Sequence, residues 1–225
     1  TAVRSEGPHR LTNPLLDVES TGEFRELAPL REKLSSLAQS AVAGGDVSHL
    51  SIYFRDLNNG PWFGVNQGET FSPASLFKVP FMMGILKQAE KDPGLLSRLL
   101  EVNLPADTAP LLVPPMRRVE PGGIYSVEDL LDLLIGHSDN VALEALYTLQ
   151  LKEVYSVVFK ELGLPVPSGS NADQRIRVKD YASFFRILYN SSYLSREMSE
   201  KALAILARSS FKQGLPHGVP AGIPV

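Results

Sequence analysis

The sequence predicts an α+β fold, in which an early pair of strands is followed by a long run of helices. Residues 48–56 alternate apolar and polar side chains, which is typical of a half-buried strand. A turn at 57–60 and a second apolar run at 61–65 complete an antiparallel pair. Because two strands alone form a marginal sheet, we expect the remaining strands of the sheet to follow Val225.

The composition indicates a globular protein, and nothing in it favours nucleic acid or an anionic membrane surface as a partner. Of 225 residues, 44% are hydrophobic and the net charge is −3, so the chain can bury a core and carries no basic surplus. No apolar run approaches the roughly 18 residues of a membrane helix. The chain has no cysteine, and its four histidines lack ligand spacing, so we expect no disulfide, no metal site and no cofactor.

The first helix is expected over residues 24–43, with Pro29 near its start and a Gly-Gly pair after its end. Residues 1–22 are polar and are interpreted as an arm or linker, which leaves one domain over residues 23–225. Loops rich in proline, glycine or serine are expected at 105–121 and 163–171. Apolar periodicity predicts seven further helices, at 75–91, 95–102, 126–135, 140–149, 151–162, 178–189 and 195–209.

Ser75 and Lys78 stand three residues apart at the start of the apolar helix 75–91, so their side chains share a face. A serine there can attack an acyl group, and a lysine can accept its proton if burial lowers the lysine pKa. Free backbone N–H groups at a helix start can bind the developing oxyanion. The alternative is structural: a serine that caps the helix and a lysine that extends its head to solvent.

The same spacing recurs at Ser209 and Lys212, so the pattern by itself is weakly specific. Ser75 opens an apolar helix, whereas Ser209 closes an amphipathic one, and we interpret the second copy as chance. The triplet Ser138-Asp139-Asn140 offers a second hydroxyl and an amide, although the same residue types also favour turns and helix caps. The two motifs together, in this order and with a helical segment between them, favour an acyl-transfer site.

These motifs resemble those of serine β-lactamases and penicillin-binding proteins, and most of all class A β-lactamases. The likeness covers residues 24–225 and is carried by Phe71-Ser-Pro-Ala-Ser-Leu-Phe-Lys78, by Pro121-Gly-Gly-Ile-Tyr-Ser126 and by Ile135-Gly-His-Ser-Asp-Asn140. It implies a helical subdomain plus helices packed on an antiparallel sheet.

The resemblance also implies roles for individual residues. Ser75 would be the acylated nucleophile, and Lys78 its base or proton relay. Ser138 would pass a proton to the leaving nitrogen, and Asn140 would hold the side-chain amide of the substrate. Asp139 would orient the turn. The implied ligand is a small β-lactam or a peptidoglycan stem peptide, and the implied location is periplasmic or secreted.

Two features of the family pattern are missing from the 225 residues. The loop glutamate of class A enzymes, in Glu-x-x-Leu-Asn, has no match in residues 162–177, where the nearest acids are Glu161 and Asp173. The Lys-Thr/Ser-Gly strand is also missing, although residues 214–216 resemble the Gly-Leu-Pro that shortly precedes it. We therefore expect the chain to be truncated at its C-terminal end.

Three functions remain open at this point. The first is a β-lactamase-like serine hydrolase that forms an acyl-enzyme on Ser75. The second is a D,D-peptidase-like penicillin-binding protein that releases a β-lactam slowly, which the missing loop glutamate favours. The third is a non-catalytic penicillin-binding sensor domain that keeps the pocket.

Overall fold

The structure is a computed structural model that describes residues 11–12, 24–57, 60–105, 117–149, 153–166 and 174–220. Most of the predicted arm, much of the predicted loop at 105–121 and Asp173 lie outside these ranges. The chain forms two compact units, one from Thr1–Ala74 with Leu164–Tyr193 and one from Ser75–Gly163 with Leu194–Val225. Both units contain helices and strands, which confirms the α+β prediction.

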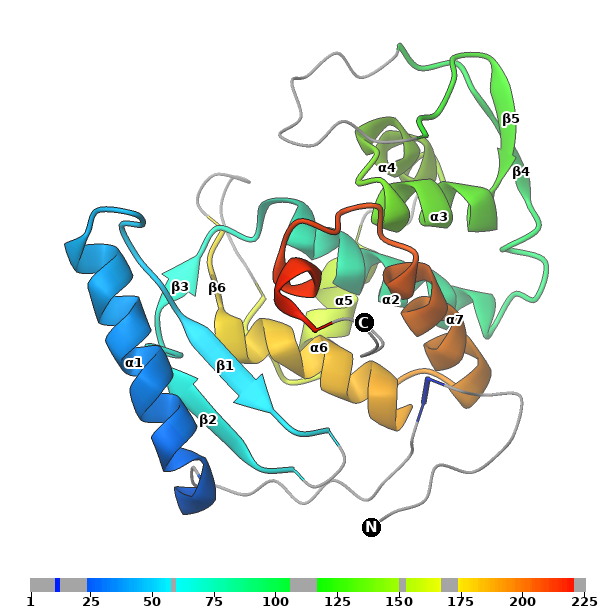
Figure 1. The fold of residues 1–225 in the computed structure, drawn as a ribbon. Coiled ribbons are helices and arrows are strands. Elements are labelled where there is room, and N and C mark those ends of the chain that lie inside the picture. Colours follow the sequence, from blue (N-terminus) through cyan, green and yellow to red (C-terminus); the bar gives the residue numbers. More distant parts are fainter. Residues whose placement is uncertain are drawn as a thin grey trace. The chain divides into compact units, whose positions relative to one another are not determined.

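The first unit is built on the predicted hairpin. Strands β1 (Ile52–Arg55) and β2 (Trp62–Val65) pair antiparallel, with Ile52 opposite Val65. Helix α1 (Ala28–Ala43), which a short 3-10 turn η1 (Arg25–Leu27) precedes, packs on β2. Helix α6 (Val178–Asn190) packs on β1, so the hairpin lies between two helices (Figure 1).

A second strand pair in this unit was not predicted. Strand β3 (Thr70–Phe71) pairs antiparallel with β6 (Ile176–Arg177), which leads directly into α6. The partners are about a hundred residues apart in sequence, and each strand has only two residues. Such short segments carry no periodicity of their own, so only the tertiary structure reveals the pairing.

The second unit is organised around helix α2 (Lys78–Ala89), which follows the 3-10 turn η2 (Ala74–Phe77). The predicted burial of this apolar helix is confirmed, because most of its residues are buried. Helices α3 (Val127–Gly136), α5 (Val154–Glu161) and α7 (Arg196–Ala207) pack on α2. Helix α4 (Asn140–Tyr147) packs on α3 and also touches α2, where the rings of Phe81 and Tyr147 meet edge to face. A 3-10 turn, η3 (Leu215–Gly218), follows α7.

The helix predicted at 95–102 is wrong. Residues Leu99–Val102 form strand β4, which pairs antiparallel with β5 (Gly123–Ser126). A short segment with two adjacent leucines fits either a helix or a strand, and its partner lies more than twenty residues ahead. The predicted helix start at Ser126 is confirmed: the Asp129 N–H donates to Ser126 Oγ, and the Ser126 N–H donates to Asp129 Oδ2.

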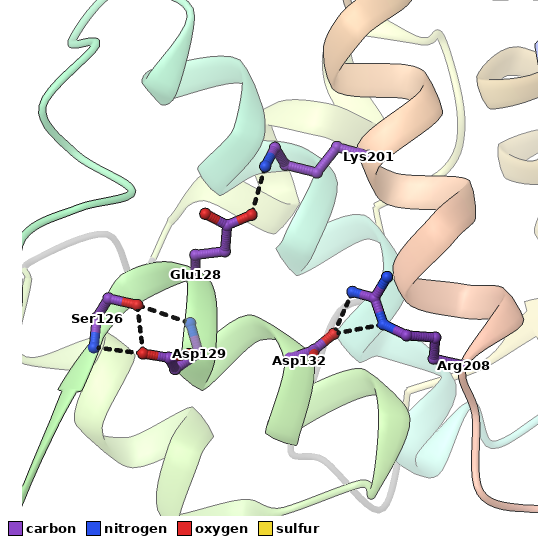
Figure 2. A network of polar contacts seen from close by, with 6 residues as sticks. All are labelled: Ser126, Glu128, Asp129, Asp132, Lys201 and Arg208. Carbon is purple, nitrogen blue, oxygen red and sulfur yellow. Dashed lines mark hydrogen bonds and ion pairs between the residues drawn. The ribbon is translucent and has the colours of Figure 1, made fainter. Parts of the chain in front are cut away.

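Helix α7 is tied to α3 by two ion pairs (Figure 2). Lys201 contacts Glu128, and Arg208 Nη2 lies 2.6 Å from Asp132 Oδ1. Both pairs are substantially exposed, so each contributes on the order of 1 kcal/mol or less.

The N-terminal end of α7 is tied to α2. The backbone N–H of Ser195, the N-cap of α7, donates to Glu90 Oε1 at 2.5 Å. Lys87 Nζ lies 2.9 Å from Glu90 Oε2. Helix α7 is thus connected at its two ends to the helices that carry Lys78 and lead to Ser138. Among the described residues, no helix is long and apolar enough to cross a membrane.

Gly84 allows α2 and α5 to approach closely. A Cβ at this position would lie 2.7 Å from Val154 Cβ and 2.9 Å from the Val154 carbonyl oxygen. Alanine gains about 1 kcal/mol over glycine from helix propensity, but overpacking costs about 1–3 kcal/mol. We expect Gly84→Ala to lower the free energy of unfolding, measured by urea denaturation.

The matched control is Gly136→Ala, at the end of α3. A Cβ there would lie 3.7 Å from the nearest atom, the Arg208 carbonyl oxygen, which is ordinary contact. We expect the control to keep or raise the free energy of unfolding. Equal stability of the two variants would show that the α2–α5 contact adapts without cost.

The Glu90 carboxylate predicts a specific acid sensitivity. Burial raises its pKa, but the Ser195 N–H and the bond and charge of Lys87 outweigh burial and hold the pKa below its ordinary 4.5. A pKa that is lower in the folded state stabilises the fold above pH 4.5, and this stabilisation is lost as the pH falls through the folded pKa.

We therefore expect Glu90→Gln to reduce the free energy of unfolding at neutral pH, and this deficit should shrink as the pH falls below 4.5 and through the folded pKa. Urea denaturation across this range measures the difference. Glu101→Gln, at an exposed position on β4, is the control. A Glu90→Gln deficit that stays constant with pH would contradict this assignment.

Candidate active site

Lys78 is the first residue of α2, and its side chain is only 3% exposed. Its ammonium donates to the Ser138 carbonyl oxygen at 2.7 Å, to Ser138 Oγ at 3.1 Å and to Asn140 Oδ1 at 2.8 Å. These contacts span about sixty residues of sequence and join the start of α2 to the turn between α3 and α4. The lysine does not extend to solvent, which argues against the structural alternative.

The turn that receives Lys78 is held in an unusual backbone conformation. Ser138 has φ of +56°, in the left-handed region that non-glycine residues rarely adopt. The next residue, Asp139, is buried and caps α4: its Oδ1 accepts from the Ala142 N–H at 2.8 Å, and its Oδ2 from the Val119 N–H at 3.0 Å. Asp139 therefore orients the turn, as the resemblance implied.

Asn140 is the first residue of α4, and its Oδ1 is oriented toward Lys78. An amide that accepts through oxygen leaves its NH₂ group as a donor. The structure thus brings together three of the four predicted site residues, Lys78, Ser138 and Asn140, through side chains of two different segments.

Ser75 lies one turn before Lys78, in η2, and is exposed. Ala74, directly before it, has φ of +43° and is a second non-glycine residue in the left-handed region. Strained backbone of this kind is concentrated at functional sites. Exposure is required of a nucleophile that must meet a substrate, and Ser75 meets this requirement.

The second Ser-x-x-Lys copy has a different environment. Ser209 and Lys212 follow the end of α7 and are not on a helix. Lys212 is exposed, and its ammonium contacts the Ala207 carbonyl oxygen at 3.4 Å. This contrast supports Ser75 and Lys78 as the functional copy.

The structure describes only one of the two acids nearest to the position of the missing loop glutamate. Glu161 is exposed at the last position of α5. Asp173 lies outside the described residues, as do residues 167–172 of the same interval. Within the described ranges, no three His, Cys, Asp or Glu side chains are placed to hold a metal ion.

The sequence gives no sign that Val119 contributes to the site. Its backbone N–H reaches Asp139 across twenty residues and fixes the carboxylate that orders the turn. A backbone donor has no residue-type signal, so no pattern in the sequence indicates this contact.

Comparison with known proteins agrees with this geometry. Residues 29–225 match the model of the β-lactamase enzyme family. No curated protein sequence is a significant match. A variant of PBP-A, solved as an acyl-enzyme complex with penicillin G, is 20% identical, with a TM-score of 0.68 over 87% of this chain and 75% of that chain.

Two β-lactamases have similar folds. The enzyme from Sphaerobacter thermophilus is 21% identical, with a TM-score of 0.67 over 84% of this chain and 74% of its own. The class A enzyme from Mycobacterium abscessus is 19% identical, with a TM-score of 0.67 over 85% and 75%. The predicted resemblance to the serine β-lactamase and penicillin-binding protein superfamily is thereby confirmed, and the chain belongs to the β-lactamase enzyme family.

Proposed function

We propose that this protein is a serine hydrolase that forms an acyl-enzyme on Ser75 with β-lactam or D-Ala-D-Ala-like substrates. The observation that carries the proposal is the buried Lys78 ammonium, bound by Ser138 and Asn140 one turn after an exposed serine. A buried charge is costly, and a fold retains one where chemistry needs it.

Lys78 acts as the base or proton relay in acylation. Its contacts with Ser138 and Asn140 are made to a carbonyl, a hydroxyl and an amide oxygen, which are neutral groups. Burial disfavours the charged form of an amine, and a lysine has to be in its neutral form to accept the proton. The proton leaves the Ser75 hydroxyl as its oxygen attacks the acyl carbon.

Ser138 delivers a proton to the leaving nitrogen. Its hydroxyl contacts the Lys78 ammonium at 3.1 Å, so a proton can pass from Lys78 to Ser138 and on to the amine. The Asn140 NH₂ group is the hydrogen-bond donor that would bind the side-chain amide of the substrate. Backbone N–H groups in the first turn before α2 can stabilise the oxyanion.

Deacylation distinguishes the proposed hydrolase from the second candidate. A D,D-peptidase-like penicillin-binding protein would acylate in the same way and release a β-lactam slowly. The interval 162–177 contains no Glu-x-x-Leu-Asn, which favours this candidate. One neighbour, a variant of PBP-A, is solved as an acyl-enzyme complex with penicillin G.

Family membership supports the proposed substrate and location. Candidate ligands are a β-lactam or a peptidoglycan stem peptide, and a substrate of the second kind would be met outside the cytoplasm, in the periplasm or by a secreted protein. The third candidate, a non-catalytic sensor domain, would bind penicillin without turnover and is separated from the other two by the measurements below.

Covalent trapping tests the assignment of Ser75. We expect one penicillin adduct, which mass spectrometry of peptides places on the segment that contains Ser75. Ser75→Ala should abolish the adduct, whereas Ser209→Ala should leave it unchanged. Lys78→Ala should slow acylation by roughly 100- to 10,000-fold. An adduct that persists in Ser75→Ala would refute the assignment.

Stopped-flow kinetics with nitrocefin test the balance of the two half-reactions. Acylation has its base in Lys78, but residues 162–177 lack the Glu-x-x-Leu-Asn glutamate that serves deacylation in class A enzymes, and such a base contributes roughly 100- to 10,000-fold. We expect a burst about equal to the enzyme concentration, followed by a slow steady state. Rapid turnover without a burst would instead indicate an efficient base, with Glu161 and Asp173 the first variants to test.

A further inference from the structure

The carbonyl oxygen of Gly136 accepts two hydrogen bonds from Ser210, which follows the end of α7. The Ser210 N–H donates to it at 2.8 Å, and the Ser210 hydroxyl donates to it at 2.9 Å. Gly136 is the last residue of α3, is buried and lies two residues before Ser138. Carbonyl oxygens at a helix C-terminus have no partner within the helix, and Ser210 supplies both hydrogen bonds here.

After α3, the chain makes a tight turn that is hydrogen-bonded to the last turn of the helix. The N–H groups of His137 and Asp139 both donate to the Leu133 carbonyl oxygen, at 3.1 and 3.2 Å. Ser138, between them, takes its left-handed conformation and presents its carbonyl and hydroxyl oxygens to Lys78. A serine keeps a left-handed backbone conformation only where the surrounding structure holds it there.

Two other groups connect the same helices, but they act farther from the turn. Arg208 pairs with Asp132, one helical turn before Gly136, and both side chains are substantially exposed (Figure 2). Lys201 pairs with Glu128, at the opposite end of α3. Exposed ion pairs restrain geometry weakly, whereas two hydrogen bonds to one buried carbonyl fix it well.

We propose that Ser210 is a positioning residue for Ser138. Its hydroxyl fixes the last carbonyl of α3, and thereby the turn that places the Ser138 oxygens against Lys78. The expected effect of Ser210 on the acylation rate rests on the proposed function, whereas its expected effect on the order of the turn does not. Ser210 touches neither the substrate nor the reacting atoms.

The kinetic arm compares Ser210→Ala with the parent protein in acylation by a fluorescent penicillin. Loss of the hydroxyl leaves one of the two hydrogen bonds and loosens the turn. Because small displacements of reacting groups cost up to about 100-fold in rate, we expect the acylation rate constant to fall about 10-fold. The dissociation constant of the initial complex and the melting temperature should change little. Ser210→Thr, which keeps the hydroxyl, should restore the rate.

Two matched variants separate positioning from general packing. Ser209→Ala removes the neighbouring hydroxyl, and Asp132→Asn breaks the Arg208 ion pair between the same two helices. We expect both to acylate within about twofold of the parent, since an exposed pair contributes little. If Asp132→Asn slows acylation as much as Ser210→Ala, general α3–α7 packing is responsible and the proposal is overturned.

Amide hydrogen exchange, followed by mass spectrometry without any ligand, is the second arm. Ser210→Ala should speed exchange in the peptide that contains His137 and Asp139 and leave the β4–β5 peptides unchanged. This arm remains decisive if the parent protein does not react with penicillin, a result that would refute the proposed function alone. Unchanged exchange in the His137–Asp139 peptide, or a Ser210→Ala variant that acylates like the parent, would overturn the role of Ser210.

Discussion

The geometry of the candidate active site depends on one buried ammonium group. Lys78 occurs in the first turn of an apolar helix, where an unpaired charge would be costly. Oxygens of Ser138 and Asn140 compensate for the lost hydration, and they come from the turn that joins two other helices. The contact therefore does two things at once: it makes a lysine tolerable inside the second unit, and it brings a second hydroxyl and an amide to the reactive group.

The price of this arrangement is backbone strain, and the structure shows what opposes it. Ser138 has a left-handed backbone conformation. On one side of it, Asp139 caps α4 and accepts a hydrogen bond from the Val119 N–H. On the other side, Ser210 donates to the last carbonyl of α3. Groups far apart in sequence thus hold one serine in a conformation that it does not favour alone. Such preorganisation is what a proton-transfer group requires, because its reaction is sensitive to small changes in distance.

The chemistry divides unequally between the two halves of the reaction. Four of the groups used in acylation have candidates in the described structure: a nucleophile, a base, a proton donor and backbone N–H groups. The water-activating glutamate of class A β-lactamases has no counterpart in the sequence of residues 162–177.

The sequence by itself determined the α+β class, the β1–β2 hairpin, most of the helices and the motifs around Ser75 and Ser138, because each depends on local periodicity or on residue types in short segments. It failed where partners are distant: residues 99–102 became a strand only because 123–126 pair with them, and the β3–β6 pair has too few residues to show a pattern. The sequence favoured Ser75 over Ser209 from the kind of helix beside each, and the tertiary structure added a difference between the two lysines. The spacing of the two is identical, and what distinguishes Lys78 from Lys212 is burial against oxygens about sixty residues away.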